Sequence, residues 1–202
     1  MLFALLLLAA PLASLPVKAN GAVQEVVPMD DRRFWDIIER SARNARDQAQ
    51  QEAGLRNILA ALSLADLVTW RAAYDAKRAA AYSWELWGAA HAIHGGASDD
   101  GFDHFRDWLI SRGQRVFEAA LADPDSLVTA IPAGANEAVA FEGFGDVVIE
   151  VWAARTDRDP ATMPASRAQP PEPIGKPLSE DPKILAARYP KLWKRFGSAP
   201  LE

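Results

Sequence analysis

The chain has 202 residues, a formal net charge of −5 and no cysteine, which excludes disulfide bonds, thiolate catalysis and cysteine-ligated zinc sites. Its acidic balance argues against nucleic-acid binding, because that function needs a basic face to displace counterions from phosphates. Hydrophobic residues at 50% and charged residues at 24% are typical of a folded protein with one domain and appendages.

Residues 1–28 form a leader that allows two interpretations. Residues 1–17 carry no charged side chain, but prolines interrupt this run and it is shorter than the roughly 20 apolar residues of a membrane span. The first interpretation is a signal-peptide-like leader, cleaved after Ala19, in a secreted or periplasmic protein. The second is a mis-called start, in a cytoplasmic protein that begins at Met29. We favour export and expect no membrane-spanning segment.

Apolar residues at steps of three and four predict a helical domain over residues 29–156. Ser63, followed by Asp66, is close to a capping box at the start of the helix that begins at residue 64. Gly95-Gly96 is expected to end the helix over residues 83–94. Asp123-Pro124-Asp125 is expected to break the last of this series. The predicted helices run over about residues 30–46, 48–62, 64–81, 83–94, 98–113 and 114–122.

Residues 137–156 fit two kinds of secondary structure. Phe141 and Phe144 begin a series of apolar residues at helical intervals, whereas residues 146–152 are rich in the β-branched side chains of a strand. We assign a helix, because the sequence offers no second convincing strand to pair with this one.

The C-terminal part combines a linker with a basic, aromatic segment. Residues 157–182 hold seven of the fourteen prolines and predict an extended, semi-rigid strap. Residues 183–202 are basic, and their aromatic side chains are spaced to fill a groove on the acidic body. We favour such docking over binding to a partner or a membrane surface. The predicted fold is therefore all-α: a single helical domain, the Pro-rich strap, and a C-terminal aromatic and basic helix that docks back.

All three histidines lie within one polar segment, where a glycine turn joins two predicted helices. Such a turn could bring imidazoles and carboxylates together for acid–base or metal-assisted chemistry. The structural interpretation, which we favour, is that the serine and aspartates cap a helix and the histidines lie at the edge of the core. We expect no metal, because the segment has neither an HExxH motif nor the His-Asp doublet of metal-dependent phosphohydrolases. We expect no cofactor, because phosphate-binding glycine motifs are missing, and a hydrolase elbow is missing as well. The candidate catalytic residues are His94, Asp99, Asp100 and His104, with His91 and Asp103 beside them.

Three of the seven tryptophans are candidates for a binding surface. Trp84 and Trp87 precede the histidines, and Trp108 follows them. The plainer interpretation is core packing, since each aromatic side chain buries a large area. The alternative is an exposed aromatic surface that binds a peptide or a sugar.

The core signature of an uncharacterised bacterial family, domain-of-unknown-function family 4240, resembles residues 84–127, which read WELWGAAHAIHGGASDDGFDHFRDWLISRGQRVFEAALADPDSL. The edges of that family are similar to MDDRRFWDIIE, which begins at Met29, and to RYPKLWKRFG near the C-terminus. The resemblance covers most of residues 29–127 and the last helix, and it implies membership without a mechanism. Relatives often carry cysteine at the position of Ala97, so a function that needs a thiol there is lost in this chain.

We predict a non-enzymatic interaction module that uses an aromatic, acidic face to bind a protein or peptide partner. The alternative is a hydrolytic or metal-assisted enzyme built on the polar segment. An enzyme should gather those side chains in a concave pocket with perturbed pKa values. A module should leave Asp99 and Asp100 in solvent as helix caps and bury the tryptophans.

Overall fold

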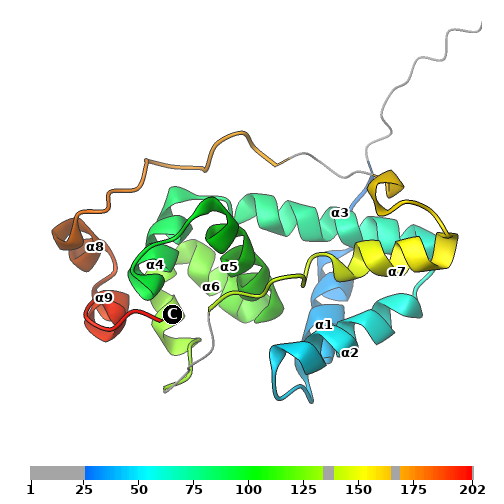
Figure 1. Cartoon of the computed structure of the whole chain (residues 1–202), viewed down its shortest axis with the longest axis horizontal. Helices are drawn as coiled ribbons and strands as arrows, with labels where there is room; N and C mark the ends of the chain where they lie inside the picture. The colour runs from blue at the N-terminus through cyan, green and yellow to red at the C-terminus, as the bar shows by residue number, and fades with distance from the viewer. Residues whose placement is uncertain (1–25, 134–138, 165–168, 202) are drawn as a thin grey trace, which may run out of the picture.

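Every regular element is a helix in the computed structural model, which describes residues 26–133, 139–164 and 169–201 (Figure 1). This confirms the predicted all-α fold. The leader prediction concerns residues that lie almost entirely outside these ranges. None of the described helices is both long and apolar enough to cross a membrane. The α-helices are α1 (Asp31–Ala42), α2 (Gln48–Ala60), α3 (Leu64–Ala80), α4 (Trp84–His94), α5 (Asp99–Ser111), α6 (Gln114–Ala122), α7 (Val147–Thr156), α8 (Pro182–Arg188) and α9 (Pro190–Phe196), and the 3₁₀ helices are η1 (Pro124–Thr129) and η2 (Pro160–Thr162).

Side-chain caps set where the first five helices begin. Each of these caps accepts a hydrogen bond from a backbone N–H three residues further on, which satisfies one of the unpaired donors in the first helical turn. The predicted Ser63 cap is confirmed, and its hydroxyl also bonds to the Asp66 carboxylate at 2.9 Å. The caps are Asp30, Asp47, Ser63, Ser83 and Ser98.

The long helix α3 connects two groups of helices, as Figure 1 shows. On one side lie α1, α2 and α7, and on the other lie α4, α5 and α6, with α1 and α3 packing against α5. Aromatic rings fill the centre. Trp70 stacks on Tyr74 with ring centroids 5.2 Å apart, and Phe34 lies 5.5 Å from Trp70. All three side chains are almost completely buried, so α3 supplies the middle of the hydrophobic core.

The helix predicted over residues 137–156 is shorter than expected, because α7 begins only at Val147. Phe141 and Phe144, which the spacing assigned to that helix, lie in the preceding turns, yet both are buried. Gly143 has φ +80°, a left-handed conformation that interrupts a right-handed helix. The Phe141 N–H donates to the carbonyl of His104 at 2.9 Å, which holds these turns against α5.

The C-terminal segment docks back on the body, as predicted, but it forms two short helices rather than one. Pro190 cannot donate a backbone hydrogen bond and disfavours helical geometry in the residue before it. Tyr189 accordingly has φ −125° and ψ 62° and separates α8 from α9. The buried Asp125 carboxylate accepts hydrogen bonds from the N–H groups of Lys191 and Leu192, at 2.9–3.1 Å. Helix α9 packs against α4 and η1, and the segment buries Leu185, Tyr189, Leu192 and Phe196.

Candidate functional site

The predicted polar segment lies where α4 ends and α5 begins, and its side chains have different surroundings. His91 and His94 are half-buried in the last turn of α4, and the His94 Nδ1 lies 3.4 Å from the Leu201 carbonyl oxygen. Asp99 and Asp100 are exposed in the first turn of α5, where carboxylates stabilise the helix dipole. The cap itself is Ser98, whose hydroxyl accepts from the Gly101 N–H at 3.1 Å.

One turn further along α5, Asp103 and His104 are half-buried. Asp103 leaves the predicted cluster and pairs with two arginines, Arg78 and Arg106. Among the residues that the structure describes, no three histidine or acidic side chains are grouped so that they could hold a metal ion. The structure therefore brings Asp103 into a different polar network from the one that the sequence predicted.

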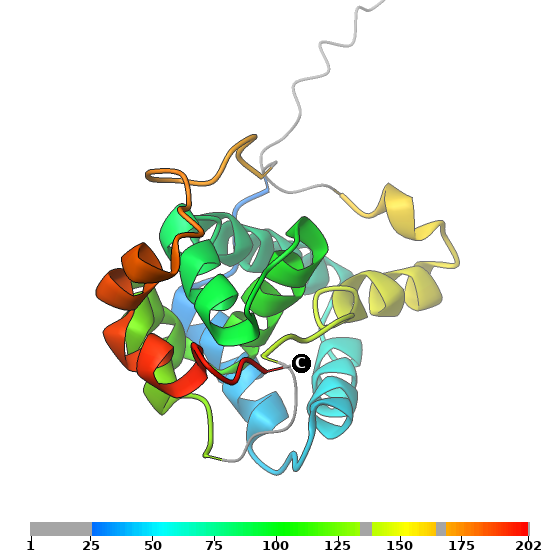
Figure 2. The same ribbon diagram turned by 60° about the vertical axis from the view of Figure 1, so that its left-hand side comes forward.

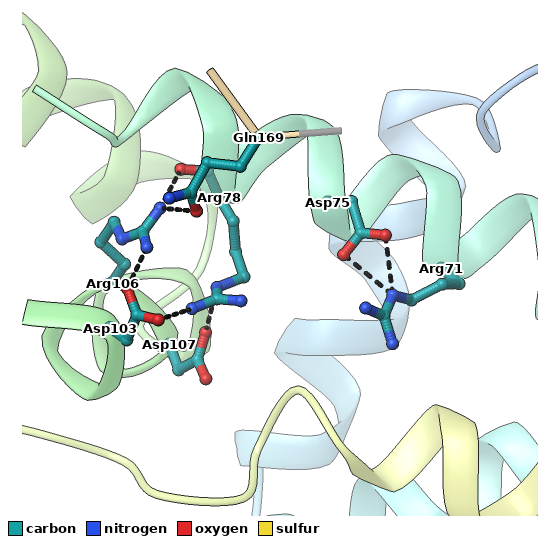
Figure 3. A network of polar contacts seen from close by, with 7 residues as sticks. All are labelled: Arg71, Asp75, Arg78, Asp103, Arg106, Asp107 and Gln169. Carbon is teal, nitrogen blue, oxygen red and sulfur yellow. Dashed lines mark hydrogen bonds and ion pairs between the residues drawn. The ribbon is translucent and has the colours of Figure 1, made fainter. Parts of the chain in front are cut away.

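This network connects α3, α5 and the strap, and it is centred on the fully buried Arg106 (Figure 3). The Nη1 group of Arg106 donates to the Arg78 carbonyl at 3.0 Å and to the Gln169 side-chain oxygen at 2.9 Å. Its Nη2 group donates to the Asp103 carboxylate. The Arg106 guanidinium also lies 4.7 Å from the centre of the Tyr82 ring, a distance typical of a cation–π contact.

Arg78 completes the network from the side of α3. Its Nε lies 2.9 Å from Asp107 Oδ1, and its Nη2 lies 3.2 Å from Asp103 Oδ2. Two guanidinium groups thus face two carboxylates. Arg106 is fully buried and Asp107 is 7% exposed, so a substrate reaches neither side chain in this arrangement. A separate pair, Arg71 and Asp75, lies nearer the N-terminal end of α3 than Arg78 does (Figure 3).

Burial dominates the electrostatics of the network. It raises the pKa of Asp107 to about 6, although the positive charge of Arg78 acts in the opposite direction. Burial also raises the pKa of the Tyr74 hydroxyl, and the nearby negative charge of Asp107 adds to this effect. A buried carboxyl that titrates near pH 6 is typical of functional sites and also of structural ion-pair networks. Its closed surroundings favour the structural role here.

Sequence analysis identified Asp103 but missed Arg78, Arg106 and Asp107. The spacing of three between Asp103 and Arg106 places them on one helix face. This spacing is too common on solvated helices to indicate a buried pair. Arg78 comes from another helix, so its part in the network depends on tertiary packing.

The three candidate tryptophans belong to one column of aromatic rings. Trp84 stacks on Trp87 at 5.2 Å, and Trp87 stacks on Phe102 at 4.7 Å. Phe105 lies 5.9 Å from both Phe102 and Trp108, which is buried. Trp84 and Trp87 are only half-buried, so the burial expected of the tryptophans holds for Trp108 but not for these two. The column therefore runs from the core to the surface at the first turn of α4.

Two hollows open on other parts of the surface. One, of about 220 Å³, lies between α6 and η1 beside Arg115 and Ser126. The other, of about 380 Å³, lies between α1 and α6 beside Arg32 and Glu39. Neither hollow is lined by a candidate catalytic or binding residue.

Comparison with known proteins identifies one family. The family described as "Protein of unknown function (DUF4240)" matches residues 29–153. No curated protein and no solved structure gives a significant match. The matched residues include the whole of α1 to α6, and with them the aromatic column and the arginines and aspartates of the network, but not Gln169.

Proposed function

Because the chain belongs to the DUF4240 family of proteins of unknown function, whose description assigns no activity, we propose its function from its own surface. It is a non-enzymatic interaction module that binds a protein or peptide partner through the aromatic end of α4. The observation that carries this proposal is the stacked column that ends at the half-buried Trp84. Next to Trp84 lies Ile174 of the strap, which is 57% exposed.

Such a surface suits binding for two physical reasons. A tryptophan held by stacking loses little conformational freedom when a partner covers it, so most of its buried area contributes to affinity. Tryptophan is also enriched among the few residues that dominate the energy of protein interfaces. The stacking of Trp84 on Trp87, and of Trp87 on Phe102, fixes the exposed ring in this way.

The enzymatic alternative has weaker support. Asp99 and Asp100 point to solvent in a helix turn, Asp103 is committed to Arg78 and Arg106, and His94 lies beside the C-terminal Leu201. Acid–base catalysis needs such groups within hydrogen-bond reach of one substrate atom. The two hollows described above are lined by other residues.

Photo-crosslinking in the native host tests the proposal. A photoreactive phenylalanine analogue replaces Trp84 in one variant and Leu121, which is 40% exposed on α6, in the matched control. We expect position 84 to give an adduct of one defined mass and position 121 to give none. The same adducts at both positions, or none at position 84, contradict the proposal.

Complementation of a deletion strain separates the module from the enzyme. We expect the Trp84→Ala variant to fail to restore the wild-type phenotype of the deletion strain, and the Asp99→Asn, Asp100→Asn double variant to restore it. The opposite result favours the enzyme. Both variants must have the wild-type circular dichroism spectrum.

A further inference from the structure

The strap passes the aromatic end of α4, where Ile174 forms a short extended bridge between bends at residues 171–172 and 175–176. Figures 1 and 2 show residues 169–181 as an orange trace that passes over α4 before the chain enters α8. Its main contact is an isolated parallel β-bridge between Ile174 and Ser83. The Ile174 N–H donates to the Tyr82 carbonyl at 2.8 Å, and the Trp84 N–H donates to the Ile174 carbonyl at 3.0 Å.

These two hydrogen bonds use backbone atoms only. The first N–H groups of an α-helix have no partner within the helix, and Trp84 is the first residue of α4. The surface thus offers one donor and one acceptor at the spacing that an extended chain needs. Binding that adds an extended peptide through backbone pairing takes its affinity from such groups and its specificity from the neighbouring side chains.

The neighbouring side chains favour a particular kind of peptide. Arg106 donates to the side-chain oxygen of Gln169, five residues before the bridged Ile174. Arg106 therefore favours a peptide with a hydrogen-bond acceptor at that position. Tyr82 and Trp84 adjoin Ser83 and bond to Ile174 through their backbones, so we expect an apolar residue at this position. Pro173 precedes Ile174 and, with its restricted φ, prepares an extended chain. The sequence of the strap therefore indicates which kind of peptide this surface binds.

The strap is held less firmly than the segment that follows it. Ile174 is 57% exposed, and its neighbours Glu172, Gly175, Lys176 and Pro177 are exposed as well. In contrast, α8 and α9 bury four large side chains against the body. Little apolar area is lost when residues 169–177 leave the surface, while α8 and α9 remain docked.

We propose that Tyr82, Ser83, Trp84 and Arg106 form a peptide-binding site that the strap occupies within the same chain. The partner presents an extended, proline-containing peptide, with an aliphatic residue opposite Ser83 and a side-chain oxygen for Arg106, and this peptide displaces residues 169–177. The inference rests on the proposed function, because it names what binds at the aromatic end of α4.

The test uses the full chain and a fluorescently labelled peptide with the sequence of residues 169–181. Ile174→Pro removes the N–H that donates to Tyr82, so the strap leaves the site more often. A competing strap lowers apparent affinity by the fraction of molecules whose site is free. We expect the peptide to bind Ile174→Pro about tenfold more tightly than the wild type, measured by fluorescence anisotropy. Glu172→Ala, an exposed change in the same strap, is the matched control and should bind like the wild type.

Two further measurements keep the test decisive. Gln169→Ala loosens the strap at its Arg106 contact and should also strengthen peptide binding, which covers the case in which Ile174→Pro does not fold. A peptide with aspartate in place of its isoleucine should bind no variant. Equal binding to all the variants, or binding to none, overturns the inference. If the peptide fails while position 84 still crosslinks a partner, the proposed function stands and the inference alone is wrong.

Discussion

Gly88 of α4 is the position where a single methyl group should disturb the docked C-terminal segment. A Cβ atom built there lies 2.3 Å from the Tyr189 hydroxyl oxygen, 2.9 Å from its Cζ and 3.0 Å from the Leu178 Cδ1. Tyr189 is 2% exposed, and its hydroxyl donates to the Glu85 carbonyl at 2.9 Å. The ring therefore cannot move aside without losing both its packing and its hydrogen bond.

The magnitude follows from three contributions. Overpacking of a well-packed site costs about 1–3 kcal/mol, and the loss of the tyrosine hydrogen bond adds about 1 kcal/mol. Alanine stabilises a helix interior by about 1 kcal/mol relative to glycine, which offsets part of the cost. We expect Gly88→Ala to lower the free energy of unfolding by about 1–3 kcal/mol.

Urea denaturation and limited trypsin digestion measure the effect. The matched control is Gly96→Ala, because no atom lies within 4 Å of a Cβ built at Gly96; its free energy of unfolding should change by no more than about 0.5 kcal/mol. Trypsin should cleave α8 and α9 faster in Gly88→Ala than in the control. Addition of Tyr189→Phe should recover part of the loss, since it removes the closest atom. Equal denaturation midpoints for the two alanine variants would refute the packing argument.

Three other predictions concern the caps and the buried network. Asp125→Ala leaves the backbone N–H groups of Lys191 and Leu192 without their acceptor and should lower the free energy of unfolding by about 2–3 kcal/mol, measured by urea denaturation. Asp125→Asn keeps an acceptor and should lower it by less. Equal losses of stability in the two variants would contradict the capping role. Burial raises the pKa of Asp107 from 3.8 to about 6, so the folded protein holds this proton more tightly than the unfolded chain. The free energy of unfolding should therefore decrease as the pH rises from 3.8 to about 6, by about 3 kcal/mol in total. Asp107→Asn should remove this decrease, and a difference from the wild type that stays constant between pH 4 and pH 7 would contradict the burial argument. Ser98→Ala should destabilise the protein by about 1 kcal/mol and Asp99→Ala by only about 0.3 kcal/mol, as seen in their melting curves, because the hydroxyl of Ser98 is the cap.

Local signals in the sequence predicted most of the helices, because their causes are local. Ser63, Ser83 and Ser98 lie directly before periodic apolar residues and cap the helices that follow. The secondary-structure predictions failed where contacts between distant parts of the chain determine the local conformation. Phe141 and Phe144 have helical spacing, but turns present both side chains to the core. Periodicity alone does not distinguish a helix from turns whose aromatic residues are buried by neighbouring elements.

The candidate site shows the same division. Trp84 and Trp87 were identified because the segment around the histidines is rich in aromatic residues. Their spacing of three places them on one helix face, and they stack. Arg78, Arg106 and Asp107 were not identified, since a buried ion pair between two helices leaves no pattern within either helix. Asp103 was assigned to the histidines next to it in the sequence, whereas in space it joins the arginines.

Helix α4 explains why the part of the chain beyond the family match is needed for this fold. The match ends at residue 153, yet later residues form hydrogen bonds with α4 in its first turn and near its end. The Ile174 carbonyl accepts from the Trp84 N–H, the Tyr189 hydroxyl donates to the Glu85 carbonyl, and the Leu201 N–H donates to the Ile93 carbonyl.

The small side chains of α4 fit this arrangement. Gly88 admits the Tyr189 ring at a distance that any Cβ atom would prevent, so the surface of α4 is shaped for residues that lie a hundred positions further along the chain. A truncation after the family match would expose this surface and the tyrosine-shaped notch within it.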